Sequence, residues 1–129
     1  MTEQIKSAKE LRVYKKAYDL AMKIFFLSKS WPADEEYSLT DQIRRASRSV
    51  CANLREAWAK RRYEAHFISK LTDADGENSD TDTWLDYALD CLYLSVEDHA
   101  RLTEDNRAIG EMLGAMLNNS RPFLTKKPL

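Results

Sequence analysis

Residues 67–92 read FISKLTDADGENSDTDTWLDYALDCL, and this stretch decides the fold. Its acidic centre, residues 73–82, contains Gly76 and invites comparison with a calcium-binding EF-hand loop. That loop needs oxygen-bearing side chains at positions 1, 3 and 5, glycine at position 6 and glutamate at position 12. With Gly76 at position 6, position 1 is Leu71, which offers no oxygen. Starting at Asp73 puts asparagine at position 6 and tryptophan at position 12, so neither register fits a calcium site.

The same stretch follows a helical repeat. Side chains expected to be buried recur at alternating spacings of four and three, as on one face of an amphipathic helix. That face consists of Phe67, Leu71, Ala74, Asn78, Thr81, Leu85, Ala88 and Leu92. The spacing predicts a long helix over residues 63–92 with its carboxylates turned outward, and Gly76 costs it up to ~1 kcal/mol relative to alanine. Asn78 and Thr81 are polar where burial is expected, so they line a cavity, face a partner chain or mark a break into two helices.

Three further helices are predicted around this one. Residues 8–30 carry two adjacent apolar stripes, as a bundle helix needs, and Pro32 disfavours helical geometry just before it. Residues 36–60 and 96–119 give the other two. The pattern predicts an all-α protein, an antiparallel up-down-up-down four-helix bundle that forms one domain over the whole chain, with a loose tail at residues 121–129.

Three further expectations concern particular residues of the first and last helices. One stripe of the first helix includes Tyr14 and Tyr18, which are therefore expected to face the bundle. In the last helix, Gly110 and Gly114 lie four residues apart and would let another helix approach closely. The expected buried residues of the last helix are Leu102, Ile109, Met112, Leu113, Met116 and Leu117.

Composition narrows the class of protein. The 129 residues carry a net charge of −1, so any nucleic-acid surface must be a local patch. The N-terminus is polar and no apolar run approaches the ~20 residues of a membrane span, so we expect a soluble, cytoplasmic protein without membrane contact. Cys51 and Cys91 each fall among apolar residues and are expected to be buried, reduced thiols.

Charge is segregated along the chain. Residues 44–62 contain seven basic residues and one acid, whereas residues 73–90 contain seven acids and no base. One interpretation, which we favour, is that these charges pair within the chain or between subunits. The other is that the arginines face phosphates, which arginine binds as a planar fork. The candidate nucleic-acid-binding residues are Arg44, Arg45, Arg48, Arg55, Arg61 and Arg62.

Catalytic patterns are not evident. Neither His66 nor His99 has the glutamate three residues earlier that a di-iron bundle requires. The sequence has no Cys-x-x-Cys pair, glycine-rich phosphate loop or G-x-S-x-G motif. We therefore expect no cofactor and a protein that is not an enzyme. The alternatives to a nucleic-acid-binding module are a protein-binding scaffold whose charged helices serve self-assembly only, and a ligand-binding bundle that uses the polar middle of residues 63–92.

Several segments resemble one known family. YSLTDQIRRASRSVCANLREAW (37–58) resembles its Y-G-L-T-x-Q-I-R-R-A pattern, and ELRVYKKAYDLAMKIF (10–25) resembles its first helix. SWPADEEYSL (30–39), DTDTWLDYALDCLYLS (80–95) and RAIGEMLGAML (107–117) resemble its first connection, third helix and last helix. The family is that of proteins encoded in intervening sequences of bacterial 23S ribosomal RNA genes, which is related to the accessory protein of diversity-generating retroelements.

The resemblance implies a function as well as a fold. It implies a bundle that assembles into a homo-oligomeric ring, typically a pentamer, with no known catalysis. RNA or DNA, or another protein, is the implied further partner; the basic accessory proteins bind nucleic acid and a reverse transcriptase. Gln42, Arg44, Arg45 and Asn53 match the family motif, whereas Ser38, Arg55 and Ala57 replace its usual Gly, Ala and Gly. We expect Asn53, like Gln42, Asn78 and Thr81, to serve structure or subunit contact, with Asn53 satisfying either a helix end or a contact between subunits.

Overall fold

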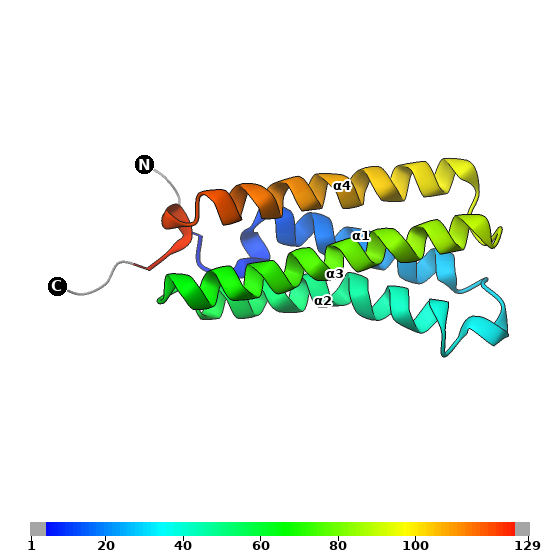
Figure 1. The fold of residues 1–129 in the computed structure, drawn as a ribbon, viewed down its shortest axis with the longest axis horizontal. Helices are drawn as coiled ribbons and strands as arrows, with labels where there is room; N and C mark the ends of the chain where they lie inside the picture. The colour runs from blue at the N-terminus through cyan, green and yellow to red at the C-terminus, as the bar shows by residue number, and fades with distance from the viewer. Residues whose placement is uncertain (1–4, 126–129) are drawn as a thin grey trace.

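The computed structural model describes residues 5–125. Within that range the α helices are α1 (Arg12–Ser28), α2 (Leu39–Ala59), α3 (Glu64–Asp90) and α4 (Val96–Asn118). Three short 3-10 helices accompany them: η1 (Ala8–Glu10), η2 (Ala33–Glu35) and η3 (Arg121–Phe123). The four α helices pack side by side, and the chain alternates in direction from each to the next (Figure 1). The prediction of an all-α four-helix bundle is confirmed.

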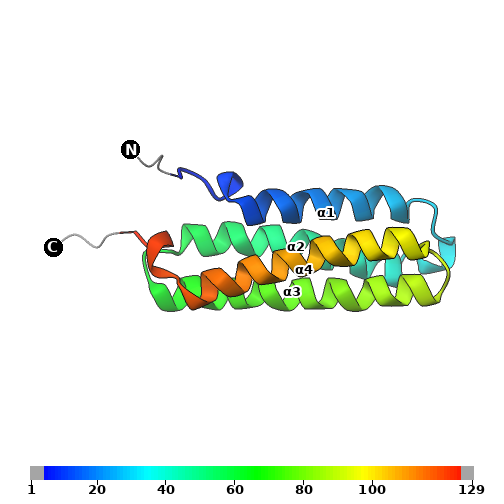
Figure 2. The same ribbon diagram turned by 90° about the horizontal axis from the view of Figure 1, so that it is seen from above.

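The four helices follow one another in chain order around the axis of the bundle. α1 packs on α2, α2 on α3, α3 on α4, and α4 on α1. α1 and α3 therefore lie diagonally across the bundle, as Figure 2 shows. One consequence matters for function: the outer face shared by α1 and α2 lies opposite the outer face shared by α3 and α4.

The buried residues of α3 follow the register expected from the sequence. They are Phe67, Leu71, Ala74, Asn78, Thr81, Leu85 and Ala88. α3 continues without a break through Gly76, which excludes two separate helices here. No helix within residues 5–125 is long and apolar enough to cross a membrane.

Leu92 is the exception to the register. It is 89% exposed and has a positive φ of 65°, so the expectation that it is buried is wrong. The Tyr93 N–H donates to the Ala88 carbonyl oxygen at 2.8 Å, and the Leu92 N–H donates to that of Leu89 at 2.9 Å. These two bonds form a Schellman motif, which needs a left-handed residue after the helix and usually has glycine there. The motif ends α3 at Asp90.

The first two helices begin later than expected. Ser7 caps η1 through a capping box with Glu10, and Leu11 is then extended (φ −66°, ψ 134°), so α1 starts only at Arg12. α2 starts at Leu39 rather than near residue 36, because η2 occupies the connection. The Leu39 N–H donates to the Glu35 side chain at 3.4 Å, which supplies a partner for one amide of the first turn.

Two expectations near the ends of helices are wrong. Cys91, which follows α3, is exposed rather than buried, whereas Cys51 is buried. The start of the tail differs from the expectation that it is loose, because residues 121–123 form η3 and the Phe123 ring stacks on Phe67 at 6.1 Å between centroids. Residues 126–129 of the expected tail lie outside the described residues.

Candidate nucleic-acid interface on α1 and α2

The six candidate arginines do not form one cluster. Arg44, Arg48 and Arg55 contact or line the side of α2 that faces α1. Arg45 is held by Asp41 one turn earlier, with its Nε 3.0 Å from a carboxylate oxygen. Arg61 stacks on Trp58, with 3.9 Å between its guanidinium carbon and the ring centroid, and Arg62 is exposed in the turn after α2. The α1-facing arginines form the candidate interface.

Phe25 of α1 orients two of these arginines. The guanidinium carbons of Arg44 and Arg48 lie 4.9 and 5.6 Å from its ring centroid, and the Lys29 Nζ also lies at 4.9 Å. The Arg44 Nε donates to the Ser28 hydroxyl at 2.9 Å. A ring face carries no net charge, so these contacts do not neutralise the cations.

The acids of residues 73–90 do not neutralise this surface. Among the described residues, two of them contact a basic side chain: Asp73 forms an ion pair with Lys70 at 3.5 Å, and a carboxylate oxygen of Asp86 lies 2.9 Å from the His99 Nε2. Glu56 holds the other side of Lys70 at 2.8 Å. The favoured interpretation, in its intrachain form, is therefore wrong: among the described residues, no acid of residues 73–90 forms an ion pair with an arginine of α2.

A half-enclosed hollow of about 380 Å³ lies between α1 and α2 beside the arginines. Tyr14, Tyr18 and Met22 from α1 line it, together with Arg48 and Arg55 from α2. The sequence expectation that Tyr18 faces the bundle is wrong, because Tyr18 is 56% exposed. The missed signal was the width of the stripe: a helix in a four-helix bundle buries a narrower face than the two stripes together cover.

Gln42 and Asn53 lie outside this surface. Gln42 is exposed and lines a hollow with Trp84 and Tyr87 of α3. Asn53 is half-buried in the middle of α2, where its amide nitrogen donates to the Ser49 carbonyl and hydroxyl oxygens at 3.0 and 3.1 Å. Of the two roles expected for Asn53, the helix end is wrong, because its bonds stay within one turn in the middle of α2, and the subunit contact stays a prediction.

Asn78 and Thr81 serve the packing of this chain. The Thr81 hydroxyl donates to the Glu77 carbonyl one turn earlier at 2.9 Å. Asn78 pairs with Asn106 of α4 by two hydrogen bonds and borders an open groove of about 650 Å³ between α3 and α4. Sequence reasoning missed Asn106, although the spacing of Leu102, Ile109 and Leu113 places it on the same buried stripe.

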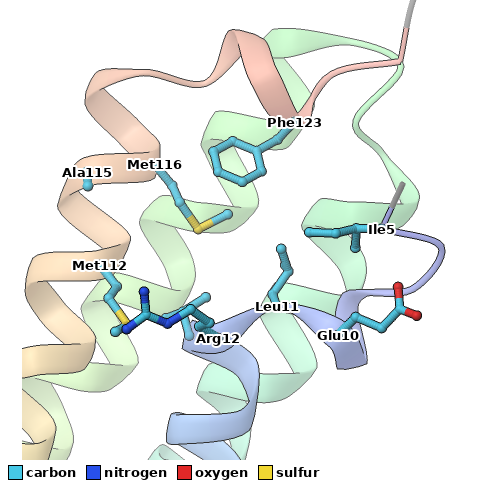
Figure 3. Close-up of a pocket in the computed structure, with 9 residues that line it drawn as sticks. Ile5, Glu10, Leu11, Arg12, Met112, Ala115, Met116 and Phe123 are labelled. Carbon is cyan, nitrogen blue, oxygen red and sulfur yellow. The ribbon is translucent and has the colours of Figure 1, made fainter. Parts of the chain in front are cut away.

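A further hollow of about 310 Å³ opens where the start of α1 meets the end of α4 (Figure 3). Leu11, Met116 and Phe123 point toward one another there, and Glu10 points away. The lining is apolar apart from Glu10 and Arg12, so it presents no convergent set of polar groups for chemistry.

Titratable groups give no catalytic arrangement within residues 5–125. No group of three or more His, Cys, Asp or Glu side chains is placed to hold a metal ion there. Burial raises the pKa of the Cys51 thiol to about 11, which disfavours the nucleophilic thiolate. His66 stands edge-on to Tyr63, and His99 contacts Asp86, so neither histidine joins a nucleophile.

Comparisons with known proteins agree with this fold. The model of the 23S rRNA-intervening sequence protein family matches residues 9–115. The structure is similar to the crystal structure of a protein of unknown function from the S23 ribosomal protein family of Bacteroides thetaiotaomicron. The two are 28% identical with a TM-score of 0.76, over 83% of this chain and 96% of that one. Curated proteins give no significant match. The family match spans most of the chain and contains all four α helices except the last residues of α4, and the chain belongs to the 23S rRNA-intervening sequence protein family.

Proposed function

We propose that this protein is a non-enzymatic, cytoplasmic interaction module that binds nucleic acid through the α1–α2 face. The observation that carries the proposal is that Arg48 and Arg55 are exposed and share one face with no acidic partner among the described residues, although the chain as a whole is near neutral. Guanidinium groups that have no carboxylate to bind are available for phosphate oxygens. The intervening-sequence family supports the proposal by its association with ribosomal RNA genes.

Salt dependence tests this proposal. Fluorescence anisotropy measures binding to a structured RNA and to duplex DNA between low and moderate salt. The double variant Arg48→Gln and Arg55→Gln should weaken binding and reduce the slope of log K against log salt by about 1.4–1.8, because two phosphate contacts are lost. Arg101→Gln with Arg107→Gln removes the same charge from arginines that already pair with Asp98, Glu104 and Glu111, and should change the slope little. No binding at low salt, or equal losses in both double variants, would overturn the proposal.

A second function, self-assembly, is favoured by a different observation. Asp75 and Asp82 of α3 border the groove between α3 and α4, away from the basic α1–α2 face, so one copy can present arginines to the acids of the next. Tyr87, Leu92 and Val96 are 56%, 89% and 70% exposed near the α3–α4 turn and add apolar surface for such a contact. A head-to-tail contact of this kind closes into a ring when the rotation between copies permits. The resemblance implies five copies.

Sedimentation velocity separates the two functions. If the arginines bind nucleic acid, the Arg48→Gln and Arg55→Gln double variant keeps the oligomer of the wild-type protein and loses RNA affinity. If they serve assembly, the same variant dissociates, and the wild-type oligomer dissociates as salt is raised. A wild-type protein that is monomeric at all concentrations would exclude the ring.

A further inference from the structure

We propose that the hollow between α1 and α2 receives an unpaired nucleobase, so that the protein prefers single-stranded nucleic acid to a duplex. This inference rests on the proposed function and deepens it, because it names the form of nucleic acid that the α1–α2 face recognises. The occupant follows from the combination of an aromatic wall, an apolar floor and two cations in one hollow.

The hollow has the size and lining of a site for a small planar group. Its volume of about 380 Å³ lies within the ~300–1,000 Å³ of small-ligand sites. Tyr14 and Tyr18 supply its aromatic wall, with their rings stacked at 6.3 Å between centroids and 26° between planes. The buried Cys51, whose thiol donates to the Tyr14 carbonyl at 3.6 Å, lines it without offering a charge.

Positive charge surrounds the aromatic wall on both sides. Arg48 and Arg55 line the hollow, two helical turns apart on α2. Tyr14, Tyr18 and Met22 also border a second, more open hollow on the other side of α1, which Lys9 and Lys15 line. Asp19 shares that second hollow but is held by Lys23 at 3.1 Å. A strand whose base enters the first hollow would therefore have cations near its backbone on either side of the entry point.

This arrangement fits a single strand better than a duplex. Bases of a single strand are free to leave the stack and to lie on aromatic side chains or guanidinium planes, whereas bases within a duplex are covered by their neighbours. An exposed ring at the centre of a basic surface adds nothing to the binding of a duplex backbone. Tyr18 is exposed enough to make the contact without rearrangement of α1.

Two single strands of equal charge test the inference. Fluorescence anisotropy compares a uridine dodecamer with an abasic strand of the same length, and a duplex is measured beside them. The wild-type protein should bind the uridine strand at least about fivefold more tightly than the abasic strand, which is the lower end of what stacking of one base provides. Tyr18→Ala should remove that preference and keep the salt slope, while Tyr18→Phe should keep both. Tyr37→Ala removes a tyrosine that is 88% exposed outside the hollow and should change neither.

The outcomes separate this inference from the function on which it rests. Equal binding of the uridine and abasic strands, with affinity that still falls as salt rises, would overturn the base site and leave nucleic-acid binding in place. No binding of any oligonucleotide at low salt would overturn both. If Tyr18→Ala leaves RNA affinity unchanged and instead dissociates an oligomer in sedimentation velocity, the hollow is covered by a second copy of the chain and the base site is wrong.

Discussion

Asn78 and Asn106 join α3 to α4 by a reciprocal pair of hydrogen bonds. Each side-chain amide nitrogen donates to the backbone carbonyl oxygen of the other residue, at 3.0 and 2.9 Å. Both residues are almost fully buried, with 6% and 3% exposure. The pair fixes the position of α3 along the bundle axis relative to α4, because sliding one helix past the other would break both hydrogen bonds at once. A purely apolar seam would permit such a shift at lower cost.

Asn106→Asp should destabilise the bundle by about 2 kcal/mol or more at pH 7. A carboxylate has the shape of the amide but no N–H to donate, so the Asn78 carbonyl loses its partner and faces a buried negative charge. Protonation restores an O–H donor, and the loss should therefore shrink at low pH. Urea unfolding of the variant and the wild type at pH 7 and pH 4 measures both effects. A loss that does not depend on pH would show that packing, rather than the hydrogen bond, matters at this site.

Replacing the glycines of α3 and α4 by alanine should change the stability of the protein in different directions. A Cβ atom at Gly114 or Gly76 meets nothing within 4 Å, so alanine should stabilise by up to ~1 kcal/mol through helix propensity. A Cβ atom at Gly110 would lie 3.1 Å from the Asn78 amide nitrogen, which the bond to Asn106 holds in place. Gly110→Ala should therefore destabilise. Urea midpoints of the three variants test this order, and equal gains at all three positions would contradict it.

Leu92→Gly should stabilise the protein by about 1 kcal/mol. The left-handed conformation is strained for leucine, and glycine adopts it freely. Because Leu92 is 89% exposed, little packing is lost within this chain. Thermal unfolding measures the gain, with Leu92→Ala as the control that removes the side chain but keeps the strain. If glycine and alanine have the same effect, the strain is not significant.

The long helices were predictable because their buried faces repeat regularly. The register of α3 identified seven buried residues in succession through an acidic segment, and it failed at Leu92, where hydrogen bonds of the chain reversal override the pattern. The same kind of repeat also contained Asn106, which the spacing of Leu102 and Ile109 places on the buried stripe of α4, as spacing placed Asn78 on that of α3. Local patterns therefore located the helices more reliably than their ends.

The candidate interface was only partly predictable, for a reason of geometry. The arginine-rich segment was evident in the sequence, but its residues divide among three environments: the α1-facing side of α2, the pair of Arg45 with Asp41, and the turn after α2. Only Arg44, Arg48 and Arg55 face α1, and the tyrosines near Arg48 and Arg55 come from α1, 30 or more residues earlier. A pairing between distant segments depends on how the helices are arranged around the bundle, which no single segment encodes.

The two cysteines should differ in reactivity. Cys51 is buried and its pKa is raised to about 11 by that burial, so little thiolate forms near pH 8. Cys91 is exposed after the end of α3. Iodoacetamide at pH 8 should therefore label Cys91 alone in the native protein and both residues in urea, as peptide mass spectrometry can show. Labelling of Cys51 at a comparable rate in native buffer would mean that α1 and α2 separate often enough to expose it.

Glu77→Gln should stabilise the protein at pH 7. Desolvation raises the pKa of Glu77, with the charges of Asp80 and Asp73 adding to the shift, so the ionised carboxylate is less favourable in the folded chain than in the unfolded one. The penalty is present above the raised pKa and is lost as pH falls through it, which means that the advantage of glutamine should disappear well below pH 4.5.

The expected gain is a few tenths of a kcal/mol, typical of relieving like-charge pairs three and four residues apart on a helix. Urea unfolding of variant and wild type at pH 7 and pH 3.5 measures the difference at each pH. Glu36→Gln removes the same charge from an exposed position before α2, away from these acids, and serves as the matched control. A gain that persists at pH 3.5 would assign the effect to the amide itself, because the carboxylate of the wild type is then protonated in both states.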